Sequence, residues 1–458
     1  MLVTTPMVLA FPERHPGRTI ACIGLMFALA YGASLVLLPK PNGQIVLGDA
    51  LEHYVQLRSV IFDRDLQFAN DYAGLYRVDE GLMREHAALK MTPTGHMRNY
   101  MPVGPALLWA PAFLCVTALV WVINALGFSY PLDGFARAFQ ATAGFSGIIA
   151  ATAGSWLTFR AAAAILDVRV AIWATLTVWL SSSALYYSLI SPAYSHAASM
   201  LAVGAFWLFW IRTGDRQDVP RYLWCGMLVG VSALMRWQDA ILIVIPALDA
   251  VWHRRDGGAR MLAARIAASG LGASLAFVPQ MIVWAVLFGA PLTIPQGPGF
   301  MKWGEPALLP VLFSDNHGLL TWTPALAFAL AGLILLARRA PRVAAAALVF
   351  FAAAWYVNAA VADWWAGEAF GARRFVSCYP IFVFGLAAFF DRLRRPRWVV
   401  GFASTFAVYT VLLLVHYQVF MHRMLAGVPY PRGFVDLWLT RFRVPFDLAA
   451  AWLGRGHG

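Results

Sequence analysis

The feature that most constrains this chain is a series of long apolar runs that recurs from the N-terminus almost to the C-terminus. A run of about 20 apolar residues matches the hydrocarbon thickness of a bilayer. The first covers residues 19–38, and the later ones, several of them short, cover 138–159, 170–190, 197–211, 222–235, 239–252, 266–289, 318–337, 343–361, 375–390 and 398–420. With 60% hydrophobic and only 13% charged residues, these runs predict an all-α polytopic membrane protein.

The orientation of the spans depends on one more run, residues 103–126, because counting it as a crossing reverses every later loop. Cytoplasmic loops of membrane proteins are enriched in Lys and Arg. If 103–126 does not cross, the inner loops hold sixteen basic residues, and if it does cross they hold five. We therefore predict about eleven spans in one integral-membrane domain, residues 1–458, with the N-terminus inside. Residues 103–126 then form a hydrophobic helix that lies at the outer surface or dips into the membrane.

This topology places most of the polar side chains that can do chemistry on the outer face. The outer segments are the first loop at 40–137, shorter loops at 191–196, 290–317 and 362–374, and the C-terminal tail at 421–458. The inner loops are short and basic, which accounts for the net charge of +12 without a nucleic-acid partner. The four cysteines lack metal-ligand spacing, so neither a zinc site nor a disulfide framework is indicated.

The first outer loop opens with Gly48-Asp49, and the apolar residues that follow recur at a helical period. This pattern predicts an amphipathic helix at 50–62 that rests on the membrane surface. The local sequence allows two interpretations of Asp49. It is either the N-cap of this helix, with Glu52 reaching back in a capping box, or an acid with a catalytic role.

Several segments resemble bacterial C-type glycosyltransferases of the GT-C fold. These multi-span enzymes take sugar from a polyprenyl-phosphate carrier, and they include lipid A aminoarabinose transferases and protein O-mannosyltransferases. The resemblance lies in Gly48-Asp49 with His53-Tyr54 and FDRDLQFANDY, in TPTGHMRNYMPVGPALLWAPAF at 92–113, in GMLVGVSALMRWQDA at 226–240, in SDNHGLLTWTPA at 314–325 and in WWAGEAFGARRFVSCYP at 364–380. It implies sugar transfer to a glycan, lipid or protein hydroxyl at the outer, periplasmic face of a bacterial inner membrane.

In that family an acid at the start of the first outer loop is the general base for the acceptor hydroxyl, and the match places this role on Asp49. A hydroxyl that attacks an anomeric carbon must lose its proton, whereas a phosphate leaving group needs charge stabilisation. The usual Gly-Asp-Glu directly before His-Tyr is here Gly-Asp-Ala-Leu-Glu. Glu52 is therefore only a candidate to share the acidic role, and His53, Tyr54 and His196 are further candidates to line the site.

Basic residues on the outer loops are candidates to hold the donor phosphate, because the guanidinium fork can bind two phosphate oxygens. The candidates for this role are Arg236, Arg373 and Arg374. A local ion pair or a snorkelling side chain explains Arg236 equally well. Contacts with lipid head groups are the alternative for Arg373 and Arg374, where a donor-site role for at least one of them is preferred. Candidates to shape the entry of acceptor or lipid are Lys302, Asp315 and His317.

Asp63 and Asp65 form an Asp-x-Asp pair that could hold a divalent cation, but aspartates are also ordinary turn formers, and we prefer a turn. The second outer loop, SPAYSHA at 191–197, contains no acid. No cofactor is therefore firmly predicted, and a divalent cation stays open. The other acids of the first loop are predicted to be solvated, namely Asp71, Asp79, Glu80 and Glu85.

Two other functions share this architecture. A secondary transporter would place ionisable residues or broken helices at the membrane midplane, often in repeated halves. The spans here lack evident duplicate halves, and the polar residues lie in the outer loops. The second alternative is a non-catalytic, lipid-binding subunit of an envelope complex. The enzyme is the preferred interpretation.

Overall fold

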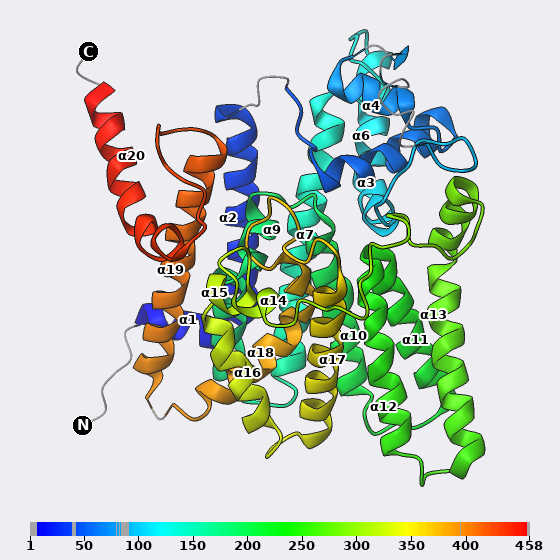
Figure 1. Ribbon diagram of the computed structural model, residues 1–458, viewed down its shortest axis with the longest axis vertical. Helices are drawn as coiled ribbons and strands as arrows, with labels where there is room; N and C mark the ends of the chain where they lie inside the picture. Colours follow the sequence, from blue (N-terminus) through cyan, green and yellow to red (C-terminus); the bar gives the residue numbers. More distant parts are fainter. Residues whose placement is uncertain are drawn as a thin grey trace. The chain divides into compact units, whose positions relative to one another are not determined.

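The computed structural model describes residues 7–38, 43–78, 80–81, 83, 91–393 and 395–455 (Figure 1). Two acids that were predicted to be solvated, Asp79 and Glu85, lie outside these residues. The described residues are mainly helical and divide into two compact units. Unit 1 comprises residues 1–20, 158–186 and 301–458, and unit 2 comprises residues 21–157 and 187–300.

Unit 2 contains the whole region between the first apolar helix and the third outer loop, apart from residues 158–186. Its elements are most of α2 (Pro16–Leu37), α3 (Asp49–Arg58), the π-helical turn η1 (Ser59–Asp63), α4 (Ala69–Tyr76), α6 (Gly104–Ala125), most of α7 (Arg137–Ala162), α10 (Ser195–Arg212), α11 (Val219–Met235), the 3₁₀ helix η3 (Trp237–Ile243), α12 (Val244–Trp252) and α13 (Gly258–Phe288). Helices α11 and α13 lie close together because Gly226 brings its backbone against the Ser269 carbonyl.

Unit 1 gathers the C-terminal helices around α8. Its elements are α1 (Met7–Arg14), α8 (Val168–Leu180), most of α9 (Ser183–Leu189), α14 (Pro310–Phe313), α15 (Leu319–Trp322), α16 (Ala325–Leu336), α17 (Pro341–Ala360), the 3₁₀ helix η4 (Arg373–Cys378), α18 (Tyr379–Phe390), α19 (Pro396–Met421), η5 (Asp436–Thr440) and α20 (Arg441–Arg455). Helix α18 packs on both α8 and α16, and it is buried along nearly its whole length.

The apolar runs form helices as predicted, but fewer of them are both long and apolar enough to span a membrane. Six helical segments among the described residues are long and apolar enough, namely α2, α6, α13, α17, η4 with α18, and α19. A seventh span is formed if α8 and α9, which meet at a bend of 73°, count as one. The other spans among the roughly eleven predicted coincide with α7, α10, α11, α12 and α16. The chain is thus an integral membrane protein.

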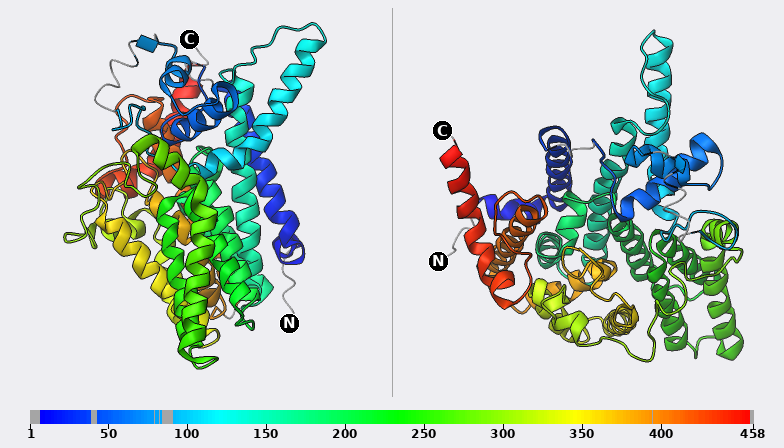
Figure 2. Two further views of the ribbon diagram at one scale, coloured as in Figure 1. Left: turned by 90° about the vertical axis from the view of Figure 1, so that its right-hand side faces the viewer. Right: turned by 45° about the horizontal axis from the view of Figure 1, so that its top comes forward.

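Helix α6 covers the run at 103–126, and it projects from the other helices of unit 2 (Figure 2). It has the length and apolar composition of a membrane span. Large apolar side chains, including Leu114, Leu119 and Trp121, are exposed along it. Such a surface suits contact with lipid. Whether α6 crosses the bilayer or lies at its outer surface stays a prediction.

The helix predicted at 50–62 is present, as α3 continued by η1, but its surroundings differ from the prediction. Eight of the ten residues of α3 are buried, so the helix does not rest on a surface with one polar face in water. Its polar side chains His53, Gln56 and Arg58 are held instead by hydrogen bonds to other parts of the first loop. Sequence periodicity could not predict the burial of α3, because buried, hydrogen-bonded polar residues give the same pattern as a solvent-exposed polar face.

Candidate active site

Asp49 is the first residue of α3, directly after a glycine in a left-handed conformation. Gly48 has φ 56°, and a Cβ atom at this position would lie 2.4 Å from the hydroxyl of Tyr194. Only glycine fits this backbone and this close approach. Gly48 is also the N-cap, and no side chain caps the helix, so the capping-box interpretation of Asp49 is wrong. The structure thus leaves the Asp49 side chain outside the capping role.

Glu52, His53 and Gln56 fasten α3 to the segment that precedes α6. The backbone N–H of Tyr100 donates to the Glu52 carboxylate at 2.9 Å. Gln56 Nε2 donates to the Asn99 side chain at 3.0 Å and to the Met101 carbonyl at 2.9 Å. These contacts use one Glu52 oxygen as a structural acceptor. They also give the motif at 92–113 a clear structural role, which is to hold the helix that begins with Asp49.

His53 is fully buried, and one hydrogen bond fixes the tautomer of its ring. Its Nδ1 lies 2.8 Å from the carbonyl oxygen of Pro102, and this oxygen can only accept, so Nδ1 carries the proton. Burial lowers the pKa of His53 to about 4, against the opposing effects of the Pro102 bond and of the Asp49 charge. The neutral ring therefore presents Nε2 as an acceptor, and this atom has no hydrogen-bond partner among the described residues.

Arg236 brings a cation to the same group. Its charge lowers the pKa of His53, while the charge of Asp49 raises it, so both charges act on one buried ring. Arg236 follows the last residue of α11, and α6 approaches α11 there through a glycine. A Cβ atom at Gly104 would lie 2.2 Å from the carbonyl oxygen of Leu234. Unit 2 thus joins Asp49, His53 and Arg236, three residues from two distant parts of the sequence.

The second outer loop reaches the start of α3 through Tyr194. The Tyr194 hydroxyl lies against Gly48, and His196 is buried behind it, with its ring centroid 4.2 Å from that of Tyr187. Sequence analysis did not single out Tyr194. Tyr194 is identified as a neighbour of the site by its position beside Gly48, because a residue larger than glycine there would clash with the Tyr194 hydroxyl.

The acids that follow α3 form a buried ion-pair cluster. Arg58 Nη1 donates to Asp63 at 2.5 Å and to Asp71 at 2.6 Å, and Asp71 is completely buried. The prediction that Asp71 is solvated is therefore wrong. Burial raises the pKa of Asp71 to about 6, although the Arg58 hydrogen bond and charge act in the opposite direction. Tyr54, a candidate to line the site, instead donates to the Gly134 carbonyl at 2.6 Å inside this core.

Asp63 and Asp65 do not fit a cation site together. Asp63 accepts from Arg58 and from Asn70, and the same oxygen takes both bonds. Asp65 accepts from the Ser59 hydroxyl and from the backbone N–H of Gln67, as in an aspartate turn. Across the described part of the chain, no three acidic, His or Cys side chains gather as metal ligands. The preferred turn interpretation agrees with these contacts.

Unit 1 carries the paired arginines at the start of η4, and the two differ in their contacts. Arg374 donates to the Asp363 carboxylate at 2.8 Å and to the Asp363 carbonyl at 2.6 Å. It is thus part of a local ion pair. Arg373 is partly exposed, and its charge acts on His317.

His317 joins the third outer loop to the C-terminal tail. Its Nδ1 donates to the Trp365 carbonyl at 2.7 Å, and its Nε2 contacts the Tyr430 hydroxyl. Burial lowers the pKa of His317 to about 4. Asp315 accepts from the backbone N–H of Gly433 at 2.9 Å, which adds a second link to the tail. These two candidates for substrate entry thus dock the tail within unit 1, whereas Lys302 has an exposed side chain.

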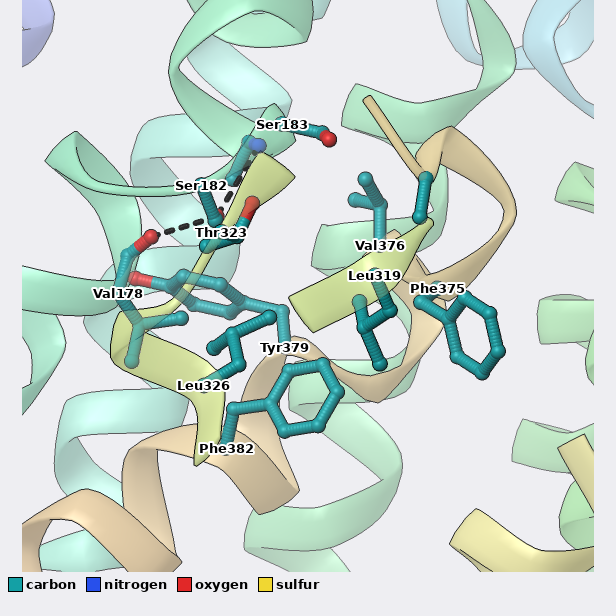
Figure 3. A pocket seen from close by; sticks show the side chains of 12 residues that line it. Val178, Ser182, Ser183, Leu319, Thr323, Leu326, Phe375, Val376, Tyr379 and Phe382 are labelled. Atoms are coloured by element: carbon teal, nitrogen blue, oxygen red, sulfur yellow. Dashed lines mark hydrogen bonds between the residues drawn. The ribbon is translucent and has the colours of Figure 1, made fainter. Parts of the chain in front are cut away.

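A small cavity lies beside η4 where α8 bends into α9 (Figure 3). Ser182 donates to the Val178 carbonyl at 2.6 Å and accepts from the Ala184 N–H at 3.2 Å, which satisfies backbone groups freed by the bend. The rings of Phe375, Tyr379 and Phe382 complete the lining. Its volume of about 10 Å³ suits a single water molecule.

Comparisons with known proteins give matches among solved structures alone. No family model matches the chain, and no curated protein matches it. The oligosaccharyltransferase AglB of Archaeoglobus fulgidus, solved with an inhibitory peptide and a dolichol-phosphate, is similar at 11% identity and a TM-score of 0.46 over 96% of this chain. This chain spans only 55% of that protein. ArnT of Cupriavidus metallidurans, solved with undecaprenyl phosphate, is similar at 14% identity and a TM-score of 0.48, over 94% of this chain and 76% of ArnT.

Proposed function

We propose that the protein is a membrane glycosyltransferase that moves a sugar from a polyprenyl-phosphate donor to an acceptor hydroxyl on a glycan, lipid or protein. The reaction takes place at the outer, periplasmic face of a bacterial inner membrane. Asp49 is the general base. The observation that carries the proposal is that two charges act on the buried ring of His53. One is Asp49, at the motif matching the family's catalytic acid, and the other is the cation Arg236.

This grouping suits the charge changes of the reaction. The acceptor oxygen forms a bond to the anomeric carbon, its proton passes to the Asp49 carboxylate, and the bond from the anomeric carbon to the phosphate oxygen breaks. The departing lipid phosphate keeps the bonding electrons and needs a nearby cation instead of a proton. Attack from the side opposite the phosphate inverts the anomeric centre. One protein acid and one or more arginines therefore suffice, and both types of residue are present on outer segments.

The remaining candidates take supporting roles in this scheme. Glu52 positions α3 through Tyr100, so its carboxylate is not needed as a second base. His53 remains neutral near pH 7, and it fixes the start of α3 through Pro102. Arg236 is the proposed phosphate contact in unit 2, and Arg373 is a separate candidate for this role in unit 1. Arg374 orients its own loop through Asp363.

The test is sugar transfer by the purified protein in liposomes, with a panel of polyprenyl-phosphate-linked sugars and release of polyprenyl phosphate as the readout. Asp49→Asn keeps the size of the side chain and removes the proton acceptor. We expect turnover to fall about a hundredfold or more with donor binding unchanged. Glu52→Gln is the matched control on the same helical turn, because its amide oxygen can still accept from Tyr100, and we expect at most a severalfold loss.

Two results would contradict the proposal. Near wild-type turnover of Asp49→Asn would remove the assignment of the base. Absence of release with every donor, by a protein whose fold is intact, would remove the glycosyltransferase itself.

A further inference from the structure

A cavity of about 330 Å³ lies in the outer part of unit 2, separate from the group around His53. It is formed by the segment that leads into Gly48, by the C-terminal end of α4 and by the loop that enters α7. Ligand pockets for small molecules or parts of larger ones begin at about 300 Å³. The cavity is therefore large enough for a phosphate or carboxylate group with part of the molecule that carries it.

Two arginines give this cavity its charge. Arg77 follows the last residue of α4, its side chain is exposed, and it lines the cavity. Arg137 is the first residue of α7, and one of its nitrogens donates to the Leu35 carbonyl. Among the described residues of the lining, the one acid is Asp133, which accepts from the backbone N–H of Phe135 at 2.8 Å. In the described part of the lining, two guanidinium groups against one engaged carboxylate favour an anionic ligand.

The lining around Phe135 is tightly packed on both sides of this ring. A Cβ atom at Gly74 would lie 2.5 Å from the ring of Phe135, so α4 packs directly on this ring. The same ring also contacts Arg58, whose guanidinium carbon lies 3.8 Å from the ring centroid of Phe135. The cavity therefore rests on the same ion-pair cluster that ends α3. A ligand would meet a formed site and would not have to order it first.

The cavity is also linked to Asp49 through the backbone. The Gln140 side chain accepts from the N–H groups of Ile45 at 2.8 Å and Val46 at 3.3 Å. These bonds fix the segment between Gly43, in the cavity wall, and Asp49. Six residues of extended chain span at most about 20 Å, which sets the largest separation of cavity wall and Asp49.

We propose that this cavity binds a phosphate or carboxylate group of the acceptor molecule. This inference rests on the proposed function, and it adds the chemical class of the acceptor. Arg77 and Arg137 bind the anion, and the reacting hydroxyl lies within about 20 Å of it, near Asp49. The acceptor is thus an acidic envelope molecule, and its anionic group sets the distance from anchor to hydroxyl.

Binding is tested without donor or turnover, so its outcome does not depend on whether transfer is detected. The probe is inorganic phosphate, titrated against the full chain in nanodiscs of phosphatidylcholine alone. The readout is protection of residues 43–48 and 131–140 from hydrogen exchange. We expect saturable protection, weakened about tenfold by Arg77→Ala and by Arg137→Ala, as for the loss of one charge-assisted contact. Arg77→Gln, which keeps a long polar side chain, should behave like Arg77→Ala.

The matched control is Arg64→Ala. Arg64 is an exposed arginine of the same outer region, outside the cavity lining, and its φ of 60° is close to the 57° of Arg77. The two alanine variants thus lose the same charge and carry similar backbone strain. Phosphate protection should be unchanged in Arg64→Ala.

Three outcomes would overturn the proposal. The first is the absence of saturable protection by phosphate, and the second is an equal loss in Arg64→Ala, which would indicate a general charge effect. In a second arm, phosphatidylglycerol is added to the nanodiscs. If this lipid alone protects both segments and blocks phosphate in the wild type, the cavity is a site for lipid head groups and not for an acceptor.

Discussion

Loss of the Arg58 guanidinium should loosen the whole first outer loop. In Arg58→Met the apolar stem remains, but Asp71, with no exposed surface, keeps a carboxylate without its cation. Breaking one partner of a buried ion pair typically costs about 3–5 kcal/mol, because the remaining charge stays desolvated. Local opening of α3 and α4 should then become between about a hundredfold and a few thousandfold more frequent, since about 1.4 kcal/mol corresponds to a factor of ten.

Hydrogen exchange of peptides from residues 49–76, measured on the protein in nanodiscs, reports this opening directly. The double variant Arg58→Met with Asp71→Leu removes both charges and should recover most of the lost protection. Arg443→Met is the control. It removes one partner of the exposed Arg443–Asp447 pair, whose side chains are 80% and 39% exposed, and such pairs contribute less than about 1 kcal/mol.

The reasoning is refuted if Arg58→Met exchanges no faster than Arg443→Met over their respective segments. It is also refuted if the double variant is as unstable as the single one. In the second case the loss would come from the Arg58 contacts with the Asp133 carbonyl and the Phe135 ring, and the buried carboxylate would not be its cause.

The other predictions concern acid stability, topology and donor binding. Because the pKa of His317 is about 4 when folded and 6.5 when exposed, the unfolded segment binds more protons between these values. Docking of residues 424–433 should therefore weaken as pH falls from 6.5 to 4, by at most about 3 kcal/mol, seen in their exchange protection factors. A cysteine at Arg216 should react with an impermeant reagent from the cytoplasm and one at Glu368 from outside, and outside labelling of Arg216 would mean that α6 crosses the bilayer. Arg373→Lys should weaken binding of a polyprenyl-phosphate donor although the charge is kept, and unaltered binding would exclude a bidentate contact.

Local sequence patterns predicted the helices but not the buried polar contacts around the site. Apolar runs and the period of 50–62 located most elements, and Gly48-Asp49 marked the start of α3. The Arg58–Asp71 pair escaped prediction because η1, the following loop and the start of α4 separate the two residues, and no helical spacing relates them. A surface helix and a buried one with paired polar residues have the same periodicity.

Residues of the candidate site could be predicted only where they lie in a sequence motif. Asp49 and Arg236 were named from segments that resemble a family, although nothing in their spacing shows that both act on His53. The role of Tyr194 depends on a close backbone approach at Gly48, and tertiary contacts of this kind leave no periodic pattern. The contact of His317 with Tyr430 spans 113 residues, which likewise lies beyond any local pattern.

The central claim is that Asp49 faces the reacting carbon of a lipid-linked sugar. The most direct measurement is a structure of the protein in nanodiscs with a non-cleavable phosphonate analogue of a polyprenyl-phosphate-sugar. We expect the Asp49 carboxylate at most about 6 Å from the anomeric carbon, on the side opposite the phosphorus, which leaves room for one hydroxyl between them. An arginine should contact the phosphonate oxygens. A sugar bound with its anomeric carbon turned away from Asp49, or next to a different acid, would contradict it.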